Sequence, residues 1–287
     1  FIDGGTLRTT ADFAISANRG ITLGASNGSI QTDAATTLTV DSTLGGAGTL
    51  TKTGAGTMVL AGDSSASFTG ITQISEGTLQ VAAGASTGTG DLIVSGTGTV
   101  LSGSGTVAGN TSVILGSVSP GDPGTASGIG TLTLAGATTD LTAGSILDLQ
   151  ITHSNGLGSV ATNLDGSGNL DWTAIESAAR NAGTSDVLDI TGLLNLVTGA
   201  TVSLSVADAG TFEKGMAWDL VDWASLGTAP TSLNFNIAFA TELSSLGLAL
   251  DTSRFATHGI IAIAPEPSRA GLIMLGTLAL ALRRRRA

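Results

Sequence analysis

The sequence predicts an all-β chain built as a parallel β-helix, a solenoid in which short strands stack coil upon coil. The first observation is a recurring Gly-Thr-apolar triplet, and the second is the alternation of apolar and polar residues around it. The third is composition: 42 of the 287 residues are Gly and only 11% are charged, against roughly 25% in an average soluble domain. Together these features indicate many short strands joined by glycine turns.

The triplets supply the repeat. They begin at Gly5, Gly48, Gly56, Gly77, Gly98, Gly105 and Gly130. Those at Gly56, Gly77 and Gly98 follow one another at two successive steps of 21 residues. This spacing is about one coil of a parallel β-helix, so we expect the three triplets to stack on successive coils.

The segments around the triplets have the period of a strand. In residues 57–60, 78–81 and 131–134, apolar side chains alternate with Thr or Gln, so one face points to a core and the other to water. Thr suits the outward positions because its β-branched side chain favours an extended backbone. A disordered Gly/Ser/Thr linker is the alternative, but linkers lack apolar residues at fixed spacing.

The residue pattern changes in the second half of the chain. Residues 140–152 still have the strand pattern, and a polar break follows at 165–169. Residues 171–183 predict a short helical insertion, with Asp171 as the N-cap and Gly183 as the residue that stops the helix. Strands return near 187–191, 201–206, 218–223 and 259–264. These strands form either further coils or a β-sandwich-like cap, which a solenoid needs to cover its last coil.

Three regions result from this division. Residues 1–152 are the predicted β-helix repeat region, and residues 153–264 are a β-rich C-terminal region that holds the helical insertion. Residues 265–287 form a tail of different composition.

Charge and residue types exclude several functions. Residues 1–264 hold 21 acids against six bases, and such a surface repels nucleic-acid phosphates and acidic lipids. We therefore expect no nucleic-acid partner. The absence of Cys excludes disulfides, zinc knuckles, iron–sulfur sites and thiol nucleophiles. His153 and His258 stand more than a hundred residues apart, which argues against a multi-histidine metal site.

One segment has the spacing of a calcium loop. Positions 1, 3, 5, 9 and 12 of that register are occupied by Asp165, Ser167, Asn169, Thr173 and Glu176. The glycine needed at position 6 is replaced by Leu170. A polar turn before an N-capped helix is the favoured interpretation, so we expect no metal and no cofactor.

Candidate catalytic groups are few. Asp186/Asp189 and Asp219/Asp222 have the form of the acid/base pair of a glycoside hydrolase. Spaced three residues apart on strands, however, the members of each pair are expected to point to opposite faces. Neither histidine has a recognisable Ser/Asp partner. We also expect Trp172, Trp218 and Trp223 to pack in the core or the cap rather than against sugars. No residue is therefore predicted to be catalytic.

Residues 44–83 resemble a known repeat. Residues 46–60 carry two Gly-Thr-apolar triplets on either side of Lys52, and residues 68–81 carry the next triplet. This pattern is similar to the autotransporter-associated β-strand repeat. The resemblance implies a right-handed parallel β-helix in an exported bacterial surface protein, with Lys52 as part of the repeat.

The tail has three blocks in a fixed order: Pro265, Glu266 and Pro267, then the uncharged residues 270–282, then Arg283, Arg284, Arg285 and Arg286. As a helix the apolar block would be about 20 Å long, and the arginines would stay on the cytoplasmic side of a membrane. The order resembles the PEP-CTERM sorting signal of Gram-negative bacteria. That resemblance implies an exosortase-type membrane transpeptidase as partner and delivery to the cell envelope or the exterior. Contact with the membrane would be made only through this tail.

The sequence thus favours an exported structural or adhesin-like protein without catalysis of its own, with surface polysaccharide or neighbouring cells as its partner. The first alternative is a carbohydrate-active β-helix enzyme, a polysaccharide lyase or hydrolase with an acidic groove. The second is a self-associating filament or coat subunit that uses uncapped strands at its N-terminal edge.

Overall fold

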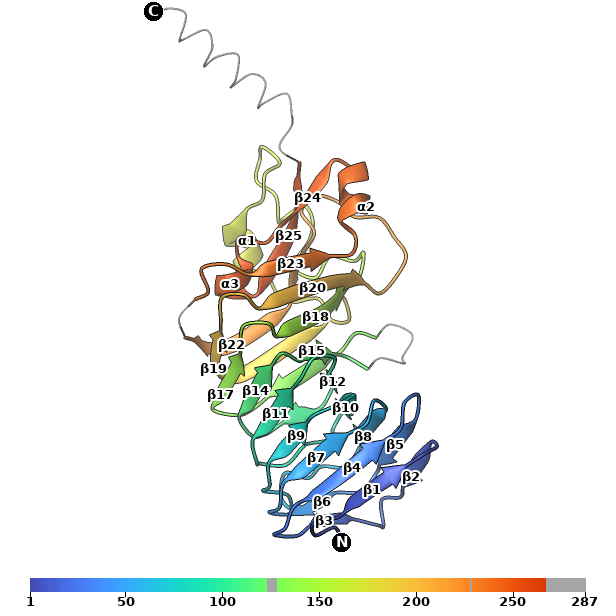
Figure 1. The fold of residues 1–287 in the computed structure, drawn as a ribbon. Helices are drawn as coiled ribbons and strands as arrows, with labels where there is room; N and C mark the ends of the chain where they lie inside the picture. The colour runs from blue at the N-terminus through green and yellow to red at the C-terminus, as the bar shows by residue number, and fades with distance from the viewer. Residues whose placement is uncertain (123–127, 228, 267–287) are drawn as a thin grey trace, which may run out of the picture.

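The computed structural model describes residues 1–122, 128–227 and 229–266, and these residues are mostly β. Parallel strands from successive coils stack along one direction, from the N-terminal coil to the C-terminal region (Figure 1). The predicted solenoid of parallel sheets is therefore confirmed. Three short helices interrupt it in the second half of the described chain.

Nine strands form one continuous wall of the coils. Across this sheet the order is β2 (Phe13–Ile15), β5 (Thr37–Val40), β8 (Thr57–Leu60), β10 (Thr78–Val81), β12 (Val100–Gly103), β15 (Ser117–Pro120), β18 (Ile146–Ile151), β20 (Thr201–Val206) and β23 (Asn234–Ile237). Every neighbouring pair is parallel, since each strand is reached by a full turn of the coil.

A second sheet has eleven strands. It contains β1 (Thr6–Thr9), β4 (Gly28–Thr32), β7 (Leu50–Thr53), β9 (Thr72–Ile74), β11 (Leu92–Ser95), β14 (Thr111–Ile114), β17 (Thr138–Leu141), β19 (Val187–Leu196), β16 (Thr131–Leu134), β13 (Thr106–Val107) and β22 (Val221–Leu226). The long strand β19 joins two walls, because its first half pairs with β16 and its second half with β17.

The third wall begins as the small sheet of β3 (Ile21–Leu23) and β6 (Leu44–Gly46). Isolated parallel bridges, Gly46 to Phe68 and Ser86 to Thr106, continue it towards β13. The triplets therefore mark all three walls rather than one. Those at Gly105 and Gly130 lie on β13 and β16, in the third wall.

The predicted 21-residue step is confirmed once and then shifts. Thr57 pairs with Thr78, as the spacing requires, but Thr78 pairs with Val100 instead of Thr99. The turn before β12 contains Gly96 and Gly98, both with positive φ, and Thr99 bonds back to the Gly96 carbonyl. This turn holds one more residue, so the third triplet is out of the predicted register.

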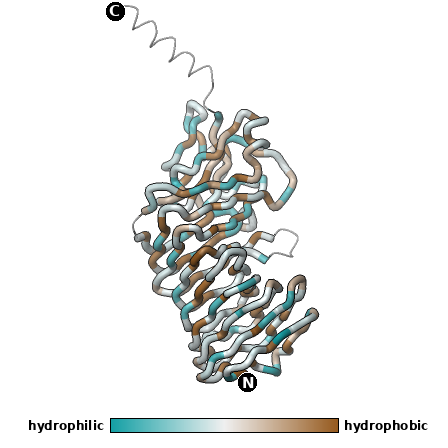
Figure 2. Tube along the Cα trace, viewed as in Figure 1, coloured by the Kyte–Doolittle hydropathy of each residue, from teal (hydrophilic) through white to brown (hydrophobic). Residues whose placement is uncertain are grey.

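Inward side chains form columns that run from coil to coil. Leu38, Met58, Leu79 and Leu101 lie in register on the nine-stranded wall and have no exposed surface. Each such burial contributes roughly 1.5–3 kcal/mol. The alternation of apolar and polar positions is visible along the coils in Figure 2. Burial of these columns is the main source of stability of the stack.

One corner of seven successive coils is occupied by glycine. The residues are Gly24, Gly48, Gly70, Gly90, Gly109, Gly136 and Gly192, one on each successive coil. A Cβ atom added to any but the first would overlap the carbonyl oxygen of the preceding member, far inside van der Waals contact. The backbones of neighbouring coils approach too closely at this corner for any side chain.

The C-terminal part contains further coils and, in place of a β-sandwich, one small antiparallel sheet. Coils continue to β23, and an antiparallel sheet of β21 (Ala217–Asp219), β25 (Ile260–Pro265) and β24 (Leu248–Asp251) follows. The helices α2 (Ala240–Ser245) and α3 (Phe255–His258) lie in this region. Phe255 of α3 packs edge-to-face on Phe235 of β23 at 5.5 Å between ring centroids, which covers the inward column of the last coil.

The helical insertion is shorter than predicted. Helix α1 spans Trp172–Ser177, and Asp171 is its N-cap, accepting a hydrogen bond from the Ala174 amide as expected. The prediction of a helix to 183 was wrong, because the backbone turns extended at Ala178. Gly183, with φ +71°, lies in a turn after the helix has ended.

The glycine corner gives a direct prediction. Gly70→Ala places a Cβ against the Gly48 carbonyl, so we expect the free energy of unfolding to fall by about 1–3 kcal/mol. Gly166→Ala is the matched control, because no atom lies near its added Cβ, and it should change stability by less than about 1 kcal/mol. Urea titrations measure both. Equal effects of the two substitutions would contradict the close approach of the coils.

Candidate functional site

Lys52 lies inside the stack. It occupies an inward position between Ile30 and Ile74 of the neighbouring coils, and its side chain has no exposed surface. Its ammonium donates to the carbonyls of Gly54 at 2.6 Å, Thr53 at 2.9 Å and Glu76 at 3.1 Å. Burial lowers the pKa of Lys52 to about 8, against the opposing charge of Glu76.

This lysine ties two coils together at their corner. The Glu76 carboxylate accepts from the Gly54 amide at 3.0 Å, so Lys52 and Glu76 satisfy backbone groups of each other's coil. Buried carbonyls without a donor would each cost about 1–3 kcal/mol. The sequence identified Lys52 only as a member of the repeat, and its role is to cap backbone carbonyls inside the core.

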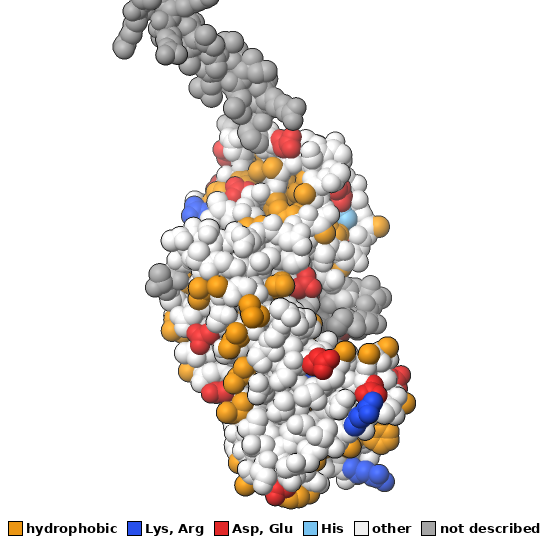
Figure 3. All heavy atoms as spheres, viewed as in Figure 1, with side chains coloured by type: hydrophobic (Ala, Val, Ile, Leu, Met, Phe, Trp, Pro, Cys, Tyr) orange, Lys and Arg blue, Asp and Glu red, His pale blue; other side chains and the backbone are white. Residues whose placement is uncertain are grey.

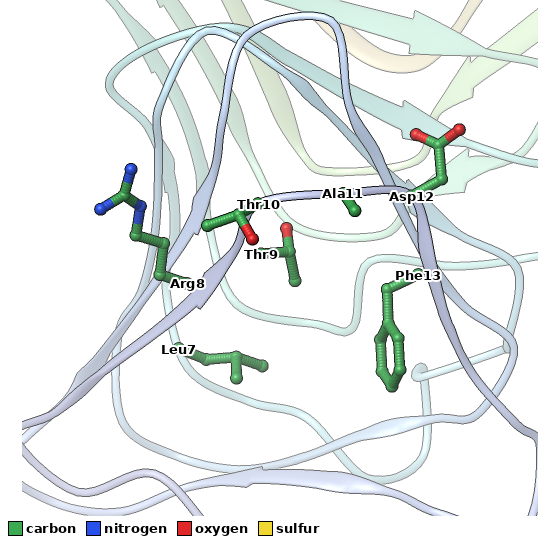
Figure 4. Close-up of a pocket in the computed structure, with 7 residues that line it drawn as sticks. All are labelled: Leu7, Arg8, Thr9, Thr10, Ala11, Asp12 and Phe13. Carbon is green, nitrogen blue, oxygen red and sulfur yellow. The ribbon is translucent and has the colours of Figure 1, made fainter.

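The first coil has an uncovered inner face. Leu7 and Phe13 lie in register with the fully buried Ile30 and Leu38, yet they are 36% and 56% exposed. The segment from Leu7 to Phe13 lines a pocket at this end, with both apolar side chains on its inner side (Figure 4). Arg8 lies beside it and holds Asp33 through two hydrogen bonds, of 2.7 and 2.9 Å, which lower the pKa of Asp33. The inward columns that begin at Leu7 and Phe13 are thus exposed at this end of the described coils.

The five residues of the calcium register do not converge. Asp165 accepts hydrogen bonds from the backbone amides of Ser167 at 2.8 Å and Asn169 at 2.9 Å, and these bonds lower its pKa. Glu176 instead pairs with Arg254 at 3.1 Å, while Thr173 lies within α1. Within 1–122, 128–227 and 229–266, no three His, Cys, Asp or Glu side chains are placed to hold a metal ion. The segment is a polar turn before an N-capped helix.

The pair Asp219 and Asp222 was predicted to point to opposite faces, and this was wrong. Both carboxylates contact Nη2 of Arg180 at 2.7 Å. The strand breaks at Leu220 between β21 and β22, so the period-2 alternation does not carry across it. Burial raises the pKa of Asp219 to about 6, and the Arg180 charge opposes this shift. The guanidinium therefore pairs with both carboxylates, although its single charge balances only one of them.

Asp186 and Asp189 are separated as expected. Asp186 is fully buried, and its two oxygens accept from the amides of Gly130 at 3.0 Å and Gln150 at 2.8 Å. Burial raises the pKa of Asp186 to about 7. Asp189 lies on β19, in register with Asp222. Since both oxygens of Asp186 are occupied by backbone groups, its role is to join neighbouring coils.

The two histidines occupy different environments. His153 is nearly buried between Asp208 and Glu242, at 3.0 and 3.2 Å. His258 is exposed and lies 3.9 Å from Glu176. The sequence contained no signal for the contacts of His153, because its partners lie 55 and 89 residues further along the chain.

Tryptophan packing follows the prediction for the core. Trp218 is fully buried and donates its indole N–H to the Ser154 carbonyl at 2.9 Å. Trp223 packs partly buried against the main core. Trp172 packs against the smaller core cluster under the Arg254 guanidinium, 5.7 Å from the ring centroid.

The predicted sorting motif begins at the end of β25. Pro265 pairs with Leu248 of β24, the Glu266 amide donates to the Gly247 carbonyl at 3.0 Å, and both Pro265 and Glu266 are exposed. Pro267, the apolar residues 270–282 and the arginines 283–286 lie outside the described residues. In the part of the chain that is described, every helix is too short or too polar to cross a bilayer.

Comparison with known proteins agrees with the repeat. Residues 50–81, which span β7 to β10 and include Lys52, match the passenger-associated-transport-repeat family. The chain is also similar to the adhesin BmaC autotransporter of Brucella suis biovar 1 (strain 1330), with 40% identity over 95 residues. That match covers 33% of this chain but only 3% of the length of the relative.

Lys52 supplies a second prediction. Lys52→Met keeps the length of the side chain but removes the donor to three carbonyls, so we expect a loss of about 1–3 kcal/mol in the free energy of unfolding. Lys214→Met, at an exposed position, is the control and should have little effect. Thermal and urea unfolding provide the measurement. An unchanged stability of Lys52→Met would show that the carbonyl cap contributes nothing.

Proposed function

We propose that this chain is a segment of an exported, adhesin-like bacterial surface protein whose coils form a stiff support. The observation that carries the proposal is the continuous stack of parallel coils, of which residues 50–81 match the passenger-associated-transport-repeat family. The similarity to an autotransporter adhesin supports a location at the cell surface or outside the cell.

The outer surface of the coils suits contact rather than chemistry. Thr37, Thr57 and Thr78 lie in register and face outward on the nine-stranded wall. Figure 3 shows few charged side chains on one face, most of them separated by uncharged surface, with one acidic and one basic group in contact towards the N-terminal end. We infer that surface polysaccharide or neighbouring cells contact such walls, which present hydroxyl groups at the regular strand spacing of about 4.8 Å.

The tail is proposed to sort the protein. In this proposal, an exosortase-type membrane transpeptidase recognises Pro265, Glu266 and Pro267, while residues 270–282 hold the chain in the inner membrane and Arg283–Arg286 remain in the cytoplasm. The exposure of Pro265 and Glu266 at the end of β25 supports it, because a membrane enzyme needs access to the motif.

Both alternatives need features that the contacts do not favour. A carbohydrate-active enzyme needs free carboxylates in a groove, whereas Asp186 is held by backbone amides and Asp219 by Arg180. The filament alternative uses the N-terminal edge, where Leu7 and Phe13 are indeed exposed, but head-to-tail growth would also need an open last coil, on which Phe255 packs. The adhesin-like support remains the function that the geometry supports best.

Peptide mapping of the native protein from separated cell fractions tests the proposal. We expect the protein in the envelope or the medium, with no peptide that extends beyond Pro267. Mutant cells that lack the protein should adhere less to surfaces, and complementation with the intact gene should restore adhesion.

Two results would contradict the proposal. A cytoplasmic protein that retains Arg283–Arg286 would overturn both export and sorting. Release of sugar from a polysaccharide by the purified chain would favour the enzyme alternative instead.

A further inference from the structure

His153 lies at the junction between the coils and the C-terminal region. It follows β18 directly, and only 8% of its side chain is exposed. The Phe212 ring packs on the imidazole at 4.4 Å between centroids. The backbone at Gly210 passes so close that an added Cβ would overlap the His153 side chain. The ring is therefore held in one place by the loop that follows β20.

Both ring nitrogens face carboxylates. Nδ1 lies 3.0 Å from Oδ1 of Asp208, and Nε2 lies 3.2 Å from Oε1 of Glu242. An ionised carboxylate only accepts hydrogen bonds, so both contacts are hydrogen bonds only when both nitrogens carry a proton. In the neutral ring one nitrogen has a lone pair, which would face a carboxylate oxygen.

The contacts join three segments that are distant in the sequence. Asp208 and Phe212 belong to the loop after β20, and Glu242 belongs to α2. Phe212 also packs against Phe239 at 4.9 Å, and Leu243 of α2 is buried in the main core. The imidazole thus lies at the edge of an aromatic cluster of His153, Phe212 and Phe239, and this cluster packs α2 and the loop against the coils.

We propose that His153 is an acid-strengthened clamp that holds α2 and the loop 207–213 on the coil stack. The charged groups that face the ring are Asp208 from the loop and Glu242 from α2. Both contacts are hydrogen bonds only when the ring carries two protons, so the clamp is stronger in acid than in base.

The sign of the effect follows from this charge change. The bridging contacts stabilise the folded chain at the acidic end and are lost as the pH rises. The other carboxyl groups whose pKa values are raised by burial, Asp148, Asp186 and Asp219, also favour the folded state in acid. A comparison of variants at each pH removes that background, because those groups are present in every variant.

Urea unfolding of the full chain at pH 5 and pH 8 tests the clamp. We expect His153→Gln to lower the folding equilibrium constant roughly tenfold more at pH 5 than at pH 8, since Gln cannot donate to both carboxylates at once and hydrogen bonds between charged groups are the stronger kind. His258→Gln is the matched control, because the exposed His258 lies 3.9 Å from a single carboxylate, and its effect should not differ between the two pH values.

A second variant keeps the test valid if His153→Gln fails to fold. Glu242 is 36% exposed on a surface helix, so Glu242→Gln should fold and should also lose stability mainly at pH 5. The clamp is refuted if Glu242→Gln loses as much stability at pH 8 as at pH 5. It is equally refuted if His258→Gln shows the pH dependence expected of His153→Gln.

Discussion

The close stacking of parallel coils is the constraint on which the rest of the structure depends. Neighbouring strands in a sheet lie about 4.8 Å apart, and here this spacing is kept around all three walls of each coil. At the corner marked by Gly48, Gly70 and Gly90 the spacing leaves no room for a side chain. Along the walls, this stacking places equivalent positions of successive coils side by side. Each new coil therefore adds one apolar residue to every inward column of the core.

Polar groups inside the stack follow from the same constraint. The carbonyls of Thr53, Gly54 and Glu76 lie at or next to turns between strands and accept from a side chain inside the stack. Lys52 supplies donors to three such carbonyls, and Asp186 supplies acceptors to two amides of different coils. Burial lowers the pKa of Lys52 and raises that of Asp186, and each group is retained because backbone hydrogen bonds compensate for its burial.

The strands could be predicted from the sequence, whereas the contacts between distant segments could not. Strands 57–60, 78–81 and 201–206 have the predicted bounds, because period-2 alternation is a local property. The extra residue in the turn at Gly96 and Gly98 changes the register without changing the pattern around it. The division of the triplets among three walls likewise depends on how the coil closes.

In the candidate sites, too, only features that depend on neighbouring residues could be predicted from the sequence. The polar turn at Asp165 and the N-cap at Asp171 were predicted because each depends on neighbouring residues. The convergence of Asp219 and Asp222 on Arg180 was missed, since a strand break at Leu220 leaves no signal in the alternation. The sorting motif is predicted from its sequence alone, and only Pro265 and Glu266 lie in the described chain.

Disulfide cross-linking between coils tests the stacking most directly, because the chain has no native cysteine. Cysteine pairs at 57/78 and 78/100 are adjacent in the register of the nine-stranded wall and should form disulfides under mild oxidation. The pair 78/99 has the spacing of the sequence repeat but is not in register, and it should cross-link poorly. Preferential cross-linking of 78/99, or none at 57/78, would contradict the coil register on which this account rests.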